Sequence, residues 1–446
     1  MTPRARAGAL LRGKAAAPGL QRPSLVSSFR DRIDTILFAF PNYGLSDAAL
    51  AEAYQSVVRA LRVGTRFVVV HHKSGGRQVR KWFDSAGHPV ANVTFVPLPD
   101  YVNFTDWAED AYVALTDGSE SRTYLMEPWE FPRAGDALIA EAIQEFTDIE
   151  AAQAPLIFQG GNCLVGDEFW LMGKDYFADS LSLVASDRAP VEKPDRKTPA
   201  AFLRRLFKDY VDFDRKLIVL GTAREIPVRE FYGTREGRQF FLDLASGGAG
   251  LFQPIFHIDM FVTLVGWNAR REFQVLVGSP AMADDMLGTT SPFALDDVYD
   301  ALAKALTREG FEVTRNPLVH RPAVAQTTTL ERLRHLATTT TNEAMFDALK
   351  ELETLGARDS TKVIVRDWHH VTWNNCLVEN TDTIGRHVYL PTFGHGRNSD
   401  LKPIDAHMKK LWTSLGFTVH PLADFNEFAR RQGVVHCIKK YLRRTP

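Results

Sequence analysis

The chain has 446 residues, of which 45% are hydrophobic and 24% are charged, so it can bury a large core and has an ordinary globular composition. Its formal net charge of -1 argues against a nucleic-acid partner, and no apolar run reaches the roughly 18 residues of a membrane-spanning helix. Three cysteines lie far apart, at Cys163, Cys376 and Cys437. They form neither a disulfide framework nor a zinc motif, which favours a reducing, cytoplasmic compartment.

The first 30 residues differ in composition from the rest. They contain no acidic residue, and their basic residues are Arg4, Arg6, Arg12, Lys14, Arg22 and Arg30. Two interpretations stay open: a disordered basic lead-in, which we favour, and a targeting peptide, although the segment lacks the apolar core of a secretory signal. We expect a single folded domain over residues 31–446.

A unit of strand, helix and strand begins after this segment. Residues 36–40 are an apolar run that the turn residues 41–44 end, which predicts a buried strand. Apolar residues then recur at helical spacing over 50–61, with Ser46 as the expected N-cap. Further strands are expected at 67–71, 93–96 and 111–115.

The same pattern recurs about five times. Its later strands are expected at 123–126, 156–158, 169–172, 217–220, 255–262, 273–278, 311–313, 363–365, 388–390 and 417–419. Its later helices are expected at 138–146, 200–210, 298–306 and 408–415, with a long Gly-rich loop before Gly250 and a helical, Thr-rich insertion at about 324–360. This recurrence predicts repeated βαβ-like units in one closed α/β domain rather than a doubly wound sheet.

Polar residues follow several of these strands, where sites are usually built. They are Asp110, the turn containing Gly161 and Asn162, the pair His257 and Asp259, and Cys437. Residues two apart in a strand share a face, so His257 and Asp259 are expected to point the same way. Taken alone, His257 and Asp259 are better explained as a core histidine and a capping aspartate, and Trp107 to Asp110 is weaker still as a motif.

The C-terminal stretch draws attention to Cys437. Val434 and Val435 predict a short buried strand before it. Cations surround it in the sequence, at Arg430, Arg431, Lys439, Lys440, Arg443 and Arg444. Positive charge lowers the pKa of a thiol from about 8.5 and favours the nucleophilic thiolate. A buried structural cysteine is the alternative, because free cysteine is among the most buried residue types.

Together these motifs resemble the guanidino-modifying enzymes of the pentein superfamily, and most of all the catalytic domain of peptidylarginine deiminases. The matching segments, in the family's order, are Trp107 to Asp110, Gly161-Asn162, His257 to Phe261, Leu276 to Pro280, and Gly433 to Cys437 followed by Arg443-Arg444. The resemblance covers roughly residues 34–446. It implies a pentein-type α/β propeller of five ββαβ-like modules around a pseudo-five-fold axis.

The resemblance also implies a reaction, without metal or other cofactor. Asp110 and Asp259 would bind the N–H groups of a planar guanidinium, and Cys437 thiolate would attack its central carbon. His257, as imidazolium, would protonate the departing nitrogen and then, as imidazole, activate water. Further substrate contacts would come from Trp107, Gly161, Asn162 and Asn375. The intermediate would be a covalent thiouronium, and the products a ureido group and ammonia.

Departures from the family refine the substrate. Gln159 stands where free-arginine and agmatine enzymes often have glutamate. Val113 and Leu164 stand at two positions where animal peptidylarginine deiminases ligate calcium, so no calcium site is expected. We therefore expect deimination of arginine, with peptidyl arginine favoured and citrulline as the product. The alternatives are an agmatine or free-arginine deiminase, an amidinotransferase, and a catalytically silent pentein that only binds its partner.

Overall fold

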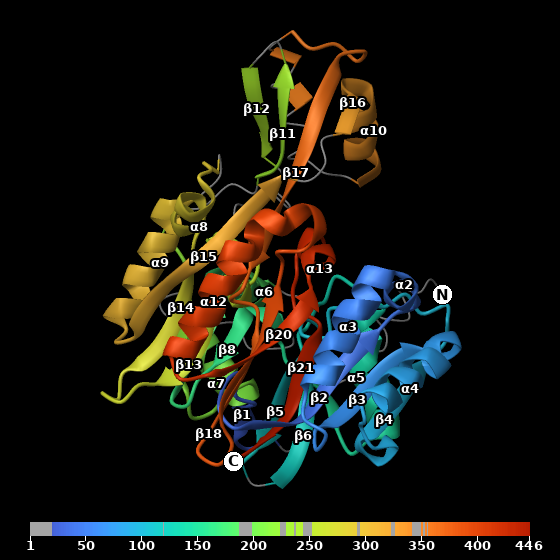
Figure 1. Cartoon of the computed structure of the whole chain (residues 1–446), viewed down its shortest axis with the longest axis vertical. Coiled ribbons are helices and arrows are strands. Elements are labelled where there is room, and N and C mark those ends of the chain that lie inside the picture. The colour runs from blue at the N-terminus through green and yellow to red at the C-terminus, as the bar shows by residue number, and fades with distance from the viewer. Residues whose placement is uncertain are drawn as a thin grey trace.

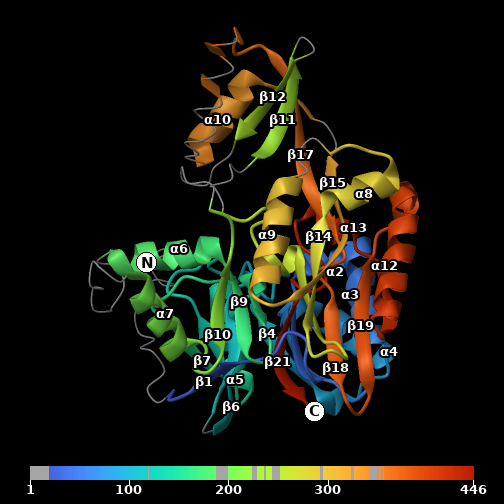
Figure 2. The ribbon, with the colours of Figure 1, turned by 90° about the vertical axis from the view of Figure 1, so that its left-hand side faces the viewer.

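The computed structural model describes residues 20–446, apart from 119, 187–198, 224–228, 236–237, 244–251, 292–294, 323–325, 341–348, 351–352 and 355. Within this part of the chain the strands form five sheets, and helices lie against their outer faces (Figures 1 and 2). The architecture is therefore mixed α/β, as the sequence predicts. No helix among the described residues is long and apolar enough to cross a bilayer.

One strand pattern is common to the five sheets. Each contains three neighbouring strands in which the first two are antiparallel and the second and third are parallel. The triplets are β21 (Lys439–Thr445), β2 (Arg32–Phe40) and β3 (Arg66–His72); β5 (Val113–Asp117), β6 (Glu120–Glu127) and β7 (Glu150–Gln153); β8 (Cys163–Val165), β9 (Phe169–Gly173) and β10 (Lys216–Leu220); β13 (Val262–Trp267), β14 (Phe273–Ser279) and β15 (Glu312–Pro322); and β18 (Leu377–Thr381), β19 (Gly385–Thr392) and β20 (Thr418–Asp424).

Helices join the two parallel strands of each triplet, because parallel neighbours need a long crossover connection. They are α3 (Ala48–Ala60); α5 (Ile139–Phe146); α6 (Lys174–Ala185) and α7 (Pro199–Tyr210); α8 (Pro280–Leu287) and α9 (Asp296–Arg308); and α12 (Lys402–Ser414). Helix α4 (Gly76–Ser85) leads to a further parallel strand, β4 (Val93–Leu98), and two short helices, α2 (Asn42–Ser46) and α13 (Asn426–Arg430), flank the first triplet. The C-terminal strand β21 lies beside the early strand β2, so one sheet combines an early strand of the chain with its last one.

An extension rises above these sheets (Figure 1). It consists of β11 (Arg229–Arg235), β12 (Arg238–Asp243), β16 (Gln326–Thr329), β17 (Lys362–Thr372) and α10 (Leu330–Thr340). Strand β17 pairs with the end of β15 and so connects the extension to the fourth sheet. The sequence predicts a Gly-rich loop, a helical insertion and a strand at 363–365 here, and β17 confirms that strand. The structure forms the strands β11 and β12 where the sequence predicts a loop. Within the described residues of the predicted helical insertion it forms the helix α10 and the short strand β16.

Helix α3 shows how the sequence forms these units. Leu50, Tyr54 and Val57 recur at helical spacing and are all buried against the sheet. The N-cap is Asp47, whose Oδ1 accepts hydrogen bonds from the backbone N–H groups of Ala49 and Leu50, at 2.9 and 3.1 Å. The predicted cap, Ser46, instead ends α2 and donates to the carbonyl of Tyr43. Asp47 accepts from two free N–H groups at the start of the helix, whereas the Ser46 hydroxyl, one residue earlier, is bonded to Tyr43.

Three predicted strands are wrong. Residues 156–158 form no strand, and the second triplet is completed by β7 at Glu150–Gln153. Residues 258–260 form a 3-10 turn before β13, and the Val434–Val435 stretch lies in turns before β21. All three stretches are nevertheless buried, with Leu156 and Val434 both 0% exposed. Apolar runs report burial, and burial does not require a strand ladder.

The folded part of the chain begins earlier than predicted. Residues 1–19 lie outside the described residues. Strand β1 (Pro23–Leu25) pairs antiparallel with β5, and Leu25 and Phe29 are buried. The segment predicted as a lead-in up to residue 30 therefore contributes its last part to the second sheet.

Candidate functional site

The candidate site is built from one recurring position. Immediately before the first strand of each triplet the chain makes a tight, buried turn. These turns carry Asp110 before β5, Asn162 before β8, Asp259 before β13, Asn375 before β18 and Cys437 before β21. All five residues are at most 5% exposed. The structure thus brings together residues up to 327 positions apart in sequence numbering, from Asp110 to Cys437.

Asn375 holds the Cys437 turn. Its Oδ1 accepts hydrogen bonds from the backbone N–H groups of His436 and Cys437, at 2.8 and 3.2 Å. Its Nδ2 lies 3.3 Å from the Cys437 Sγ and 3.3 Å from the carbonyl oxygen of Asp259. One amide therefore positions the thiol and offers it a hydrogen-bond donor, which favours negative charge on sulfur.

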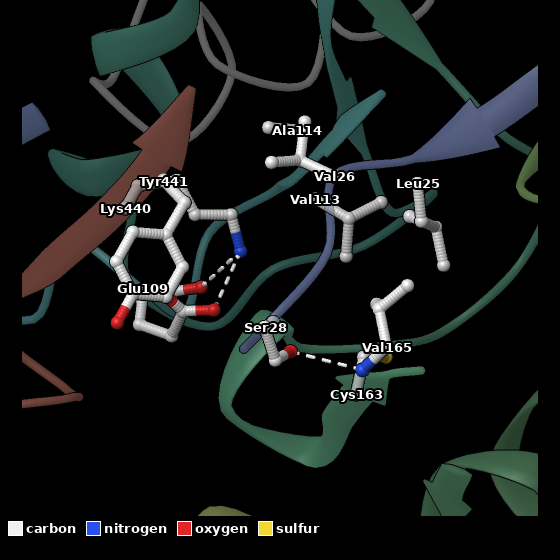
Figure 3. Close-up of a pocket in the computed structure, with 11 residues that line it drawn as sticks. Leu25, Val26, Ser28, Glu109, Val113, Ala114, Cys163, Val165, Lys440 and Tyr441 are labelled. Carbon is white, nitrogen blue, oxygen red and sulfur yellow. Dashed lines mark hydrogen bonds and ion pairs between the residues drawn. The ribbon is translucent and has the colours of Figure 1, made fainter. Parts of the chain in front are cut away.

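The basic residues near Cys437 are not available to activate it. Lys439 donates to one carboxylate oxygen of Glu109 at 2.6 Å. Lys440 donates to the other at 2.9 Å and also to the Glu109 carbonyl (Figure 3). We call these three residues the Glu109 clamp. Arg431 pairs with Asp106 at 2.6 Å, and Arg444 donates to backbone carbonyls.

The expectation of a resting thiolate is therefore wrong. Burial raises the pKa of Cys437 well above its usual value, and the nearby Asp259 and Asp110 raise it further. The cause is the surroundings: carboxylates, not cations, lie closest to the sulfur, with Asp259 Oδ2 at 3.8 Å. In the site without substrate Cys437 is a thiol.

Asp259 has a histidine partner that the sequence analysis overlooked. His436 Nδ1 and Asp259 Oδ2 are joined by a 2.8 Å hydrogen bond, and both side chains are almost fully buried. Burial raises the pKa of Asp259 well above its usual value, and lowers the pKa of His436 well below its own. Both shifts favour the neutral form of Asp259 and of His436 in the empty site. The other oxygen, Asp259 Oδ1, has no hydrogen-bond partner.

His257 immediately precedes the η6 turn (Ile258–Met260) as its N-cap residue. Gln159 Oε1 lies 2.8 Å from its Nε2, so Nε2 carries the hydrogen and Nδ1 has the free lone pair. Gly161 abuts the ring, since a Cβ there would lie 2.6 Å from Nδ1. Burial, with the nearby cation Arg133, lowers the pKa of His257 to about 3. His257 is therefore neutral in the empty site, so the imidazolium that the resemblance implies for protonating the departing nitrogen has to form during the reaction.

Asp110 is paired with an arginine that sequence reasoning did not place. Arg133, from the segment between β6 and α5, donates from Nη2 to Asp110 Oδ2 at 2.7 Å. The other oxygen, Asp110 Oδ1, lies 3.6 Å from His257 Nδ1 and has no hydrogen-bond partner. Burial raises the pKa of Asp110, and Arg133 opposes that rise. No local pattern marks Arg133, because its partner lies 23 residues away in another turn.

Three polar atoms of the site are therefore buried and lack hydrogen bonds: Asp110 Oδ1, Asp259 Oδ1 and His257 Nδ1. Buried polar groups are nearly always hydrogen-bonded, so such a cluster indicates a missing ligand. Two carboxylate oxygens and a basic nitrogen suit a ligand that donates several N–H groups. We call Asp110, His257, Asp259 and Cys437 the reactive cluster. No group able to hold a metal ion is found among the described residues.

The remaining predicted contacts have packing partners. Trp107 packs against Gly433 and Phe428, and the Arg431 guanidinium lies over its ring. Asn162 Oδ1 accepts from the backbone N–H of Ile258 at 3.0 Å, so it holds the turn that follows His257. Asn375 lies at the thiol itself, as described above. Cys163 and Cys376 are buried thiols whose pKa values burial raises.

Comparisons with known proteins were made at the levels of sequence and fold. No family model matches the chain, and no curated protein matches its sequence. Three of the solved structures that share its fold over nearly their whole length illustrate the match. They are Campylobacter jejuni agmatine deiminase (TM-score 0.53, 12% identity, 95% of this chain and 96% of that one), Enterococcus faecalis agmatine deiminase (0.54, 15%, 96% and 97%), and a protein provisionally assigned as a peptidyl-arginine deiminase (0.53, 11%, 94% and 98%). The chain has the pentein fold.

Proposed function

We propose that this protein is a cysteine-dependent hydrolase of guanidinium groups. The observation that carries the proposal is the reactive cluster, in which two unpartnered carboxylate oxygens and an unprotonated imidazole nitrogen accompany a buried thiol. A guanidinium is planar, cationic and rich in N–H donors, so it fits two facing carboxylates. The five triplets, each contributing one residue to this place, support a propeller of five modules around a pseudo-five-fold axis.

The bound cation would itself activate the site. In the empty protein burial raises the pKa values of Cys437, Asp259 and Asp110, and of these three groups Asp110 is the one that pairs with a cation, Arg133. A guanidinium that donates to Asp110 and Asp259 adds a positive charge beside Asp259 and Cys437 and lowers the pKa values of both. The thiol proton then passes to neutral His257, which acts as the base. The imidazolium expected from the sequence is thus formed during the reaction.

The chemistry then runs in two halves. The Cys437 sulfur attacks the guanidinium carbon, and His257 returns its proton to the departing nitrogen, which leaves as ammonia. This gives an S-linked thiouronium. His257 next takes a proton from water as its oxygen attacks the same carbon, and cleavage of the C–S bond releases the ureido product and the thiol. Such acid–base work contributes about 10²–10⁴-fold in rate.

We favour a small guanidino compound such as agmatine or arginine as the substrate. This choice revises the expectation of peptidyl arginine from sequence. It is supported by the full-length fold match to agmatine deiminases, one of which, as a cysteine-to-serine variant, has been solved with its substrate bound. It is also supported by the burial of the reactive atoms, since a small molecule can be fully enclosed. The match to a provisional peptidyl-arginine deiminase keeps peptidyl arginine as the second candidate.

The deciding experiment is an ammonia-release assay with agmatine, arginine, methylarginines and benzoyl-arginine amide. We expect turnover of one of the small compounds, with kcat/KM at least about 100-fold above that for benzoyl-arginine amide, a difference of about 2.7 kcal/mol. The opposite preference would support the peptidyl substrate. Transfer of the amidino group to an added amine, in place of ammonia release, would identify an amidinotransferase. No turnover of any compound, with tight guanidinium binding, would indicate a silent binding protein.

A further inference from the structure

The strongest unexplained feature of the site is Arg133. Its Nη2 donates to Asp110 Oδ2 at 2.7 Å, and its Nε donates to Asp136 Oδ2 at 2.5 Å. Its side chain is 30% exposed, whereas those of Asp110 and Asp136 are 8% and 1% exposed. Arg133 thus reaches from the surface to the carboxylate that the substrate is proposed to use. It carries the same functional group as that substrate.

The backbone that carries Arg133 is firmly held. The Trp129 N–H donates to the carbonyl of Leu156, and Gln153 Nε2 donates to the carbonyls of Pro128 and Trp129. Gly135 lies so close to Asn103 that a Cβ would be 1.8 Å from its carbonyl oxygen. The backbone of the segment is therefore held at both ends, so a displacement of the Arg133 guanidinium would have to come from rotation of its side chain.

Asp136 fixes the near end of that side chain. Its two carboxylate oxygens accept from the backbone N–H and the hydroxyl of Thr105, at 2.6 and 2.7 Å. Phe131 lies beside the guanidinium, with its ring centre 4.9 Å from the Arg133 Cζ. Arg133 can therefore release Asp110 while keeping a carboxylate at Nε and an aromatic face.

We propose that Arg133 is a gating residue: its guanidinium occupies half of the substrate's position on Asp110 and must be displaced when substrate binds. The inference rests on the proposed function, and it adds a regulatory contact to that site. A bidentate guanidinium needs both oxygens of a carboxylate, and Arg133 holds Oδ2 while Oδ1 stays open.

The exchange has a clear energetic reason. An isolated carboxylate in a buried site is costly, and Arg133 compensates Asp110 while the site is empty. At Asp110 an incoming guanidinium replaces one planar cation with another, so the charge of that carboxylate stays compensated throughout the exchange. A primary ammonium lacks the planar pair of N–H donors and competes poorly with Arg133 for the same carboxylate. The contact would therefore favour guanidino compounds over simple amines.

The test uses guanidinium chloride as the probe and protein with Cys437→Ala, in which no turnover can occur. Binding is measured by calorimetry with and without Arg133→Met. We expect guanidinium to bind at least five-fold more tightly when Arg133→Met is present, because no side chain competes for Asp110. Arg122→Met is the matched control. It removes an exposed arginine that pairs with Glu150, and it should leave guanidinium binding unchanged.

A supporting role for Arg133 predicts the reverse. If Arg133 only positioned Asp110, its loss would weaken guanidinium binding, and equal or weaker binding would overturn the inference. Arg133→Lys serves if Arg133→Met does not fold, as judged by circular dichroism; it keeps a cation for Asp136 but cannot bridge both carboxylates, and it too should tighten binding. The proposed function fails separately, if neither protein binds guanidinium and the wild type turns over no guanidino compound.

Discussion

Two buried charged clusters lie side by side in this protein and differ in one respect. In the Glu109 clamp each charged atom has a partner, with Lys439 and Lys440 on the two oxygens of Glu109. In the reactive cluster three polar atoms have no hydrogen bond. Glu109 and Asp110 are adjacent in sequence, and the Glu109 N–H donates to the carbonyl of Cys437. The clamp therefore joins the two turns that carry Asp110 and Cys437, and the cluster beside it is left open for a ligand.

This difference distinguishes buried polar groups that stabilise the fold from buried polar groups that are kept for chemistry. A charge that is paired inside the protein needs its partner to remain folded. A charge that is left unpaired reduces stability and is retained for a ligand that will pair it. The two clusters should therefore respond oppositely to removal of a carboxylate, and the predictions below use that contrast.

The largest effect is expected at the nucleophile. Cys437→Ser should lower kcat by about 10³-fold or more, because a serine hydroxyl is a far weaker nucleophile than a thiolate at neutral pH. Cys163→Ser and Cys376→Ser are the controls and should retain activity. The measurement is ammonia release with the best guanidino substrate. Substantial turnover by the Cys437 variant would contradict the covalent mechanism.

Removal of a carboxyl group from the reactive cluster should lower activity but not stability. Asp259→Asn should lower kcat/KM by about 100-fold or more, because a desolvated charge pair with the guanidinium is lost. The thermal midpoint should stay the same or rise, since the pKa of Asp259 is raised and the folded protein favours its neutral form.

The sign can be checked against pH. A carboxyl with a raised folded pKa contributes stability at low pH, and this contribution is lost as pH rises through the folded value. The advantage of Asp259→Asn over the wild type in the free energy of unfolding should therefore grow as pH increases from 4 to 8. A variant that becomes relatively less stable over this range would show that Asp259 is charged and paired in the empty site.

Removal of a charge from the clamp should have the opposite effect. Glu109→Gln should lower the free energy of unfolding by about 3–5 kcal/mol, because Lys439 and Lys440 are left buried without an anion. Glu145→Gln, an exposed change on α5, is the control and should alter stability little. Urea unfolding measures both. A clamp variant as stable as the wild type would remove the distinction between the two clusters.

A smaller effect is expected in the pH dependence of activity. The profile of kcat/KM reports groups of the free enzyme, in which the Cys437 pKa is raised and that of His257 is lowered to about 3. In the proposed mechanism the reactive free enzyme has a thiol and a neutral imidazole, so activity should stay nearly constant between these two pKa values and show no limb near the ordinary histidine value of 6.5. A bell centred near pH 6.5 would instead indicate the thiolate–imidazolium pair that the sequence suggests.

No effect is expected from calcium. Val113 and Leu164 are apolar, and both are at most 3% exposed in the core. A hard cation requires oxygen ligands, which these residues cannot offer. Ammonia release should therefore be the same in excess chelator and in millimolar calcium, and strong activation by calcium would contradict this expectation.

The sequence by itself determined the α/β class and most strand and helix positions, and its resemblance to the pentein superfamily pointed to the residues of the reactive cluster. It could do so because periodicity and motif spacing are local: the face of α3 and the run of β2 each lie within a few turns of chain. Where burial alone set the pattern, as at Leu156 and Val434, the same signal predicted strands that do not form.

Only the tertiary structure decided the charge states of the site. Lys439 is 330 positions from Glu109, and Arg133 faces Asp110 from a different turn, so no sequence pattern reveals either pairing. The cations beside Cys437 in sequence turned out to compensate other groups, and burial beside two aspartates left the thiol protonated. The physical reason is that a pKa depends on distance and desolvation in three dimensions, and neighbours in sequence do not fix either.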